Sequence, residues 1–303
     1  MAEILVKAAS FVAIIILGYV LRRKGLFKQE DFHVLSKIVL KITLPAAIVS
    51  NFSGIDLKPS MLLLSALGLG GGVLLITSSL VMNAGKSRNE RAFGVINLSG
   101  YNIGNFTMPF AQGFLGPMGV VATSLFDAGN AFVCLGGSYS IASMIKGGDK
   151  KFSIMPILRT LVKSVPFDAY VVMTVLSLLH LSMPSPIVSF AGIIANANAF
   201  LAMFMIGVGF KLSGDMSQTG KIAKILLVRY GISIALAAAF FFLLPLDLGY
   251  RQALAILSFS PIASAAPAFT ADLKEDFGLA SAINSISIVI SIVLITVTLI
   301  LIL

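Results

Sequence analysis

Long apolar stretches, separated by short polar connections, follow one another along the whole chain. A helix of roughly 20 apolar residues crosses the hydrocarbon core of a bilayer, and runs of this length recur throughout the 303 residues. We expect one transmembrane unit over 1–303, because no connection is long enough to form a separate soluble domain. The pattern predicts ten membrane-spanning helices, over 4–21, 33–52, 60–83, 92–114, 118–145, 157–180, 186–210, 221–245, 252–273 and 277–303.

Two of these predicted spans are interrupted by polar residues and prolines. The interruptions cover Leu98–Pro109 in the fourth span and Leu257–Pro267 in the ninth. In hydrocarbon, a broken helix persists only where it is buried in protein or lines a wet cavity. Breaks at matching places in two halves of a chain are a strong sequence pointer to the binding site of a transporter. An alternative is a kinked helix whose Asn side chains only bond neighbouring helices.

Composition supports the membrane prediction and argues against a nucleic-acid partner. The chain is 57% hydrophobic and 12% charged, with a mean hydropathy of +0.99, whereas soluble domains carry about 25% charged residues. The net charge of +9 comes from basic residues in short connections, not from one basic face or tail. We therefore expect membrane lipids as the surroundings and no nucleic acid. A single cysteine and two histidines predict no metal site.

The basic residues also predict an orientation. The connections after spans one, three, five, seven and nine, with the adjoining helix ends, hold all of the 22 Lys and Arg residues except Lys7, Lys58 and Arg251. Cytoplasmic connections are enriched in Lys and Arg, so we expect a multi-pass protein of the cell membrane with both termini outside. Lys41 and Lys163 are expected to extend to the membrane surface.

Ten spans divide into two sets of five, over 1–145 and 157–303. A repeat with an odd number of spans must insert in opposite orientations, which predicts an inverted repeat. Leu98-Ser99 matches Leu257-Ser258, and Gly119 matches Gly278 at the same spacing.

The two breaks contain the candidate substrate-binding residues. They are Asn102, Asn105, Thr107 and Pro109 in the first break, and Ser260, Ser264 and Pro267 in the second. Proline removes a backbone donor and clashes with the carbonyl four residues back. We therefore expect the helix to break just before Pro109 and a second half-helix to start near Phe110, with its positive end suited to an anion. Neither break contains Lys or Arg, so we expect a small organic anion held by amides and helix dipoles.

Asp127 is the acidic residue that we place deepest in the membrane. A charge at the centre of a bilayer costs at least ~2.5–3.5 kcal/mol, so the side chain should face the protein interior. One hypothesis is a coupling site for a proton or sodium ion, with Asn130 one turn away and Asn284 on the tenth span, which corresponds to the fifth. The other is a structural hydrogen bond to the broken backbone. We expect no further cofactor.

Several motifs resemble those of one transporter family. The first part of the chain contains Leu17–Leu26, Leu35–Lys37, Leu44–Ala46, Asn102–Gly104, Met108-Pro109, Leu115–Gly119 and Phe126–Asn130, and Gly207–Leu212 and Pro267 follow later. These segments resemble the auxin efflux carrier family, which includes plant PIN-type auxin exporters and bacterial or yeast malate and malonate permeases. The chain departs from that pattern at Thr107, where many relatives have Gly. It also lacks the plant Asn-Pro-Asn-x-Tyr signature and a soluble insert between spans five and six.

The resemblance implies a fold like those of sodium/bile-acid symporters and sodium/proton antiporters. Spans 1, 2, 6 and 7 would form a scaffold, and spans 3–5 and 8–10 a mobile bundle in which broken spans 4 and 9 cross near the midplane. It also implies a homodimer and an auxin-like or dicarboxylate substrate. The predicted function is secondary transport of a small organic anion by alternating access. Alternatives are a sodium-coupled bile-acid or organic-acid symporter, and a non-transporting membrane sensor or structural protein. An enzyme is disfavoured, because no catalytic triad, metal-ligand set or carboxylate pair is evident.

Overall fold

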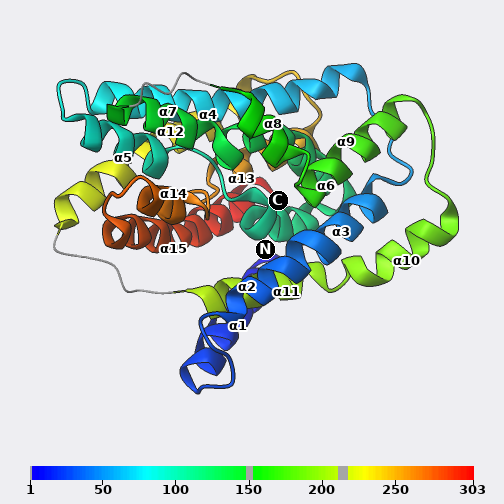
Figure 1. The fold of residues 1–303 in the computed structure, drawn as a ribbon. Helices are drawn as coiled ribbons and strands as arrows, with labels where there is room; N and C mark the ends of the chain where they lie inside the picture. Colours follow the sequence, from blue (N-terminus) through cyan, green and yellow to red (C-terminus); the bar gives the residue numbers. More distant parts are fainter. Residues whose placement is uncertain (1, 148–152, 211–217) are drawn as a thin grey trace.

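The fold is all-helical, as the sequence predicts. The computed structural model describes residues 2–147, 153–210 and 218–303, and these contain helices and connections but no strand. The first part of the chain forms α1 (Ala2–Arg23), α2 (Asp31–Ile38), α3 (Leu44–Phe52), α4 (Leu63–Met82), α5 (Arg88–Leu98), α6 (Met108–Phe132) and α7 (Ser138–Gly147). The second part forms α8 (Met155–Leu161), α9 (Val165–Leu178), α10 (Ser185–Ala195), α11 (Asn198–Gly209), α12 (Thr219–Leu243), α13 (Leu248–Ser258), α14 (Ala266–Asp272) and α15 (Phe277–Ile302) (Figure 1).

Some predicted features fall on residues that the structure does not describe. The connections between the predicted spans 118–145 and 157–180, and between 186–210 and 221–245, lie partly outside the described ranges, and so does the end of the motif Gly207–Leu212.

Seven helical segments within the described ranges are long and apolar enough to cross a membrane, or eight if the bent pair α8 and α9 forms one span. Many large apolar side chains on these segments are exposed, such as Phe190 and Phe242. An apolar exterior of this kind suits a lipid environment. The fold is therefore compatible with a multi-pass membrane protein.

The segment count differs from the predicted ten at three places. The predicted spans 92–114 and 118–145 fall within one 60-residue segment, Arg88–Gly147. The predicted span 252–273 falls on α13 and α14, which are separated by an irregular segment and are each too short to cross a bilayer alone.

The predicted span over 157–180 is bent rather than straight. The chain bends by 80° between α8 and α9. Pro166 lies in the first turn of α9, and Ser164 before it is extended. Proline has no N–H, and its ring clashes with the carbonyl four residues earlier, so a helix cannot continue through this position without a break.

Glycines allow two helix pairs to pack closely. A Cβ atom on Gly129 of α6 would lie 1.8 Å from the carbonyl oxygen of Ser65 on α4, and one on Gly68 of α4 would lie 2.0 Å from that of Phe126. Gly207 of α11 lies equally close to α1, with 2.0 Å between such a Cβ and the carbonyl oxygen of Ile15. Close backbone approach at small residues is typical of packing between membrane helices. The α4 contact fixes the part of α6 that contains Asp127.

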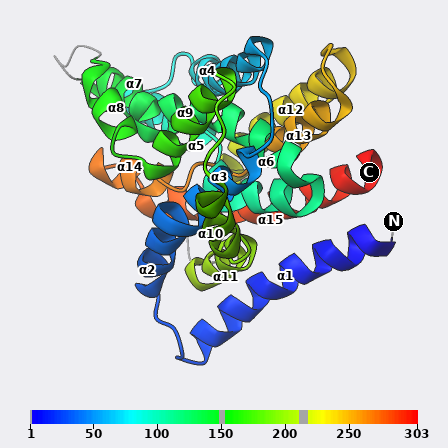
Figure 2. The ribbon, with the colours of Figure 1, turned by 90° about the vertical axis from the view of Figure 1, so that its right-hand side faces the viewer.

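The two ends of the chain lie on the same side of the molecule. Figure 2 shows α1 running from the N-terminal end on the right to the α1–α2 connection at the lower left, while α15 runs back to the C-terminus on the right. That connection includes Lys24 and Lys28.

Candidate functional site

The two broken helices meet inside the protein. After α5 ends at Leu98 the chain is irregular over 99–102, and after α13 ends at Ser258 it is irregular over 259–265. The backbone N–H of Asn102 donates to the carbonyl of Pro261 over 2.9 Å. The hydroxyls of Thr107 and Ser260 are 2.6 Å apart and hydrogen-bonded. The sequence prediction of two interrupted helices is confirmed, and the two interruptions contact each other.

The first break does not begin where the proline rule placed it. Gly100 has φ +75, a left-handed conformation that favours glycine. A Cβ there would also lie 2.9 Å from Cys134 Sγ, so the chain after α5 lies beside the π-helical turn Val133–Gly137 that follows α6. A π-helical turn, Ile103–Thr107, then leads into α6, which begins at Met108 with Pro109 in its first turn. The expected break just before Pro109 is therefore wrong, because a proline in the first turn needs no hydrogen-bond acceptor and starts a helix.

Arg229 on α12 binds both breaks. Its guanidinium is fully buried. It donates to four carbonyl oxygens: those of Leu98 at 2.5 Å, Gly100 at 2.8 Å, Ser260 at 2.9 Å and Pro261 at 3.2 Å. The breaks themselves contain no Lys or Arg, as the sequence shows, and this basic side chain comes from a helix distant in sequence.

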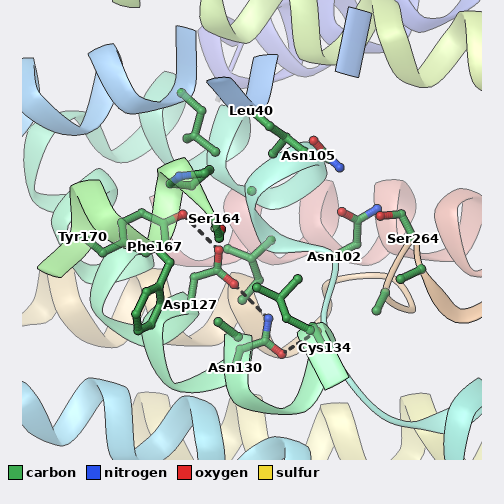
Figure 3. Close-up of a pocket in the computed structure, with 18 of the residues that line it drawn as sticks. Leu40, Asn102, Asn105, Asp127, Asn130, Cys134, Ser164, Phe167, Tyr170 and Ser264 are labelled. Carbon is green, nitrogen blue, oxygen red and sulfur yellow. Dashed lines mark hydrogen bonds between the residues drawn. The ribbon is translucent and has the colours of Figure 1, made fainter. Parts of the chain in front are cut away.

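Asn130 holds the backbone of the first break. Its side-chain oxygen accepts from the N–H of Tyr101 at 3.0 Å, and its amide donates to the carbonyl of the same residue at 2.9 Å. The amide also donates to Asp127 Oδ1 at 2.8 Å, and the hydroxyl of Tyr170 on α9 donates to Asp127 Oδ2 at 2.9 Å. Within the described residues, Asp127 therefore bonds Asn130 and Tyr170 and not the broken backbone itself (Figure 3).

Asn284 and Ser287 on α15 hold the second break. The Asn284 amide donates to the carbonyls of Ile262 and Ala263 at 3.2 and 3.3 Å, and the Ser287 hydroxyl accepts from the N–H of Ile262 at 3.2 Å. Side chains of the tenth predicted span thus bond the backbone of the second break, as Asn130 of the fifth predicted span bonds that of the first.

Two cavities adjoin the place where the two breaks contact each other, which we call the crossing. The first, of about 260 Å³, is lined by residues such as Asp127 and Tyr170, and the second, of about 400 Å³, by residues such as Asn284 and Pro267. Asn102, Asn105 and Ser264 line both. Figure 3 shows the side chains of Asn102 and Ser264 next to each other at the first cavity.

The side chains shared by the two cavities are not used to hold the breaks together. Asn102 and Ser264 take no part, through their side chains, in the hydrogen bonds that hold the breaks together. The side-chain oxygen of Asn105 is buried and has no hydrogen-bond partner in the described part of the chain. Buried polar atoms are normally satisfied, so an unsatisfied amide beside a cavity is suited to a ligand.

The predicted site residues thus separate into three groups. Asn102, Asn105, Ser264, Pro267, Asp127, Asn130 and Asn284 line one or both cavities. Thr107 and Ser260 are fully buried and bond each other, and neither lines these two cavities. Pro109 is buried at the start of α6. Lys41 and Lys163, expected only at the membrane surface, line the first cavity.

Sequence reasoning missed Arg229, Tyr170 and Ser287. A signal for Arg229 was present, because it lies well inside the apolar run of α12, and an ionisable residue inside a membrane span is a candidate functional residue. Tyr170 and Ser287 carry no such signal, since Tyr and Ser are ordinary in membrane helices.

No protein-family model matches this chain, and no curated protein matches it.

Proposed function

We propose that this protein is a secondary transporter that moves a small organic anion across the membrane by alternating access. The observation that carries the proposal is the pair of broken helices whose contact region presents Asn102, Asn105 and Ser264 to two cavities. A broken helix costs stability unless its backbone finds partners. The buried side-chain oxygen of Asn105, which has no hydrogen-bond partner among the described residues, is suited to a ligand in the adjoining cavities.

The proposed fold is ten spans arranged as two inverted repeats. The half-helices α5 and α13 are both 11 residues long and end in breaks that contact each other. Gly116 departs from helical geometry inside α6, with φ 62 and ψ −151, which divides the 60-residue segment into two spans. Counting α8–α9 and α13–α14 as one span each then gives ten. The shared side of the two chain ends agrees with an even number of spans (Figure 2).

The helix packing supports a scaffold and a mobile bundle. α1 packs on α11, and α3 on α9 and α10; separately, α4 packs on α6, and α12 on α13. Figure 1 shows α1, α2, α3, α10 and α11 grouped apart from α4, α5, α7, α12 and α15. In the proposed membrane orientation both termini are outside, and the cavities lie between the two groups.

The chemistry of the first cavity favours an anion. Asn102 and Asn105 supply amide donors, and Lys41 and Lys163 add positive charge. Auxin-like carboxylates and small dicarboxylates are the proposed substrates. Amides bind a carboxylate without the strength of a buried ion pair, which suits a site that must also release its ligand.

Asp127 is the proposed coupling residue. It lines the first cavity and accepts hydrogen bonds from Asn130 and Tyr170. The Asp127 carboxylate lies between the cavity and Asn130, which holds the first break. Binding of a proton or cation to this carboxylate can therefore change the position of that break.

Uptake by proteoliposomes tests the proposal. Labelled auxin, malate and malonate are offered under imposed proton or sodium gradients. We expect uptake of at least one anion, and an at least tenfold lower uptake by Asn102→Ala. Asn51→Ala is the matched control, because the Asn51 amide bonds only the carbonyl of Ala47 on its own helix and should leave uptake unchanged. Equal uptake by Asn102→Ala and the wild type would contradict the proposed site.

A further inference from the structure

Arg229 is a buried cation whose neighbours are backbone carbonyls. Its Nη1 and Nη2 atoms contact two carbonyl oxygens of the first break, from Leu98 and Gly100, and two of the second, from Ser260 and Pro261. Its Nε has no partner within the described residues. In those ranges no acidic side chain forms an ion pair with it.

A buried charge without a counter-charge is costly, so something else must stabilise the guanidinium. The last carbonyls of a helix carry the equivalent of about −0.5 elementary charge. Leu98 is the last residue of α5, and Ser260 follows the end of α13 by two residues. The ends of two helices thus supply about one negative charge in total, which matches one guanidinium. The face of the Tyr101 ring, 5.2 Å from the guanidinium carbon, adds a cation–π contact.

The same set of groups is suited to a free monovalent cation. In transporters with broken helices, unwound carbonyls and the C-terminal ends of half-helices coordinate the coupling sodium ion. We propose that the Arg229 guanidinium permanently occupies a monovalent-cation site at the crossing, so that this site binds no free sodium in the wild type and binds sodium when the guanidinium is removed.

Two consequences follow for the molecule. The breaks are tied to each other and to α12 through one side chain, so these three segments form one body. If the proposed transport function holds, a sodium ion at this position cannot drive transport, and coupling depends on Asp127 instead. The second consequence rests on the proposed function, whereas the occupied cation site does not.

Thermal unfolding in different salts tests the inference without any transport assay. The purified protein is unfolded in sodium chloride and in choline chloride at equal ionic strength. We expect equal midpoints for the wild type. For Arg229→Ala, which removes the cationic donor from four carbonyls, we expect a midpoint about 2–4 °C higher in sodium than in choline. Arg251→Ala is the control, because the Arg251 guanidinium bonds only the carbonyl of Phe241, and it should respond as the wild type does.

A second variant covers the case in which Arg229→Ala is too unstable to purify. Arg229→Gln retains a side-chain donor but not the charge, and should also be stabilised by sodium relative to choline. Recovery of folded Arg229→Ala in sodium but not in choline would support the inference as well. A sodium-specific rise for the wild type would overturn it, and so would equal behaviour of both variants in the two salts. Such a failure would leave the uptake experiment unaffected.

Discussion

In both breaks, side chains bond backbone groups that have no partner within a helix, but the two breaks use different side chains. In the first, one Asn130 amide satisfies both the N–H and the carbonyl of Tyr101. In the second, the task is divided, since Asn284 donates to two carbonyls and Ser287 accepts the N–H of Ile262. Asn130 lies on α6, which follows the first break, whereas Asn284 and Ser287 lie on α15, one helix beyond α14.

The difference between the breaks lies in charge. In the first break, Asn130 also donates to Asp127, which accepts a second hydrogen bond from Tyr170. No acidic residue lines the second cavity, as far as the described residues show. The proposed coupling group therefore comes from the first half of the chain alone, while both halves line the two cavities.

The largest expected effect comes from removing that charge. Asp127→Asn keeps the size of the side chain and an oxygen that accepts from Tyr170. We expect accumulation of substrate against a gradient to be abolished, because the titratable group is lost, while substrate binding persists. Uptake and equilibrium binding are measured on the same preparation. Accumulation at the wild-type level would show that Asp127 is structural and that the two halves do not differ in the way proposed.

The next largest effect is a difference in stability between variants that weaken the first break and variants that weaken the second. Asn130→Ala leaves the buried N–H of Tyr101 and the Oδ1 of Asp127 without their Asn130 partner, at a cost of about 1–3 kcal/mol for each such group, while the Tyr101 carbonyl still accepts from the Ile103 N–H. Asn284→Ala leaves the Ile262 N–H bonded to Ser287, so we expect a smaller loss of stability. Thermal unfolding of both variants in the same detergent measures the difference. If Asn284→Ala lowered the unfolding midpoint by more than Asn130→Ala does, the idea that the first break depends mainly on one residue would be contradicted.

The smallest effect concerns Gly100. Alanine in a left-handed conformation costs about 1–2 kcal/mol, and at this position its Cβ would also approach Cys134 Sγ and Ala263. Gly85 has a similar φ of +77 but no atom within 4 Å of such a Cβ. We therefore expect Gly100→Ala to lower the unfolding midpoint by more than Gly85→Ala does. Equal shifts would mean that contact at the crossing adds nothing to the conformational cost.

The sequence predicts the part of this site that depends on local chemistry. Prolines and polar residues inside apolar runs indicate both breaks, and the predicted repeat singles out Asn284, although as an ion ligand and not as the residue that bonds the backbone of the second break. Contacts between distant segments cannot be derived in this way. Arg229 lies 131 residues from Leu98 in the chain, and a nearly uniformly apolar helix such as α12 does not reveal which of its faces points inward. The exact position of the first break depends on Gly100 rather than Pro109, because proline is tolerated at a helix start.

Access to the crossing from both sides of the membrane is the most direct test of the account. Ser264 lines both cavities, so a Ser264→Cys variant in a Cys134→Ser background places one thiol there. In membrane vesicles of either orientation, we expect a membrane-impermeant thiol reagent to label position 264 from both sides, and the transported anion to slow both reactions. Labelling from one side only, or labelling that the anion does not affect, would contradict alternating access at the crossing.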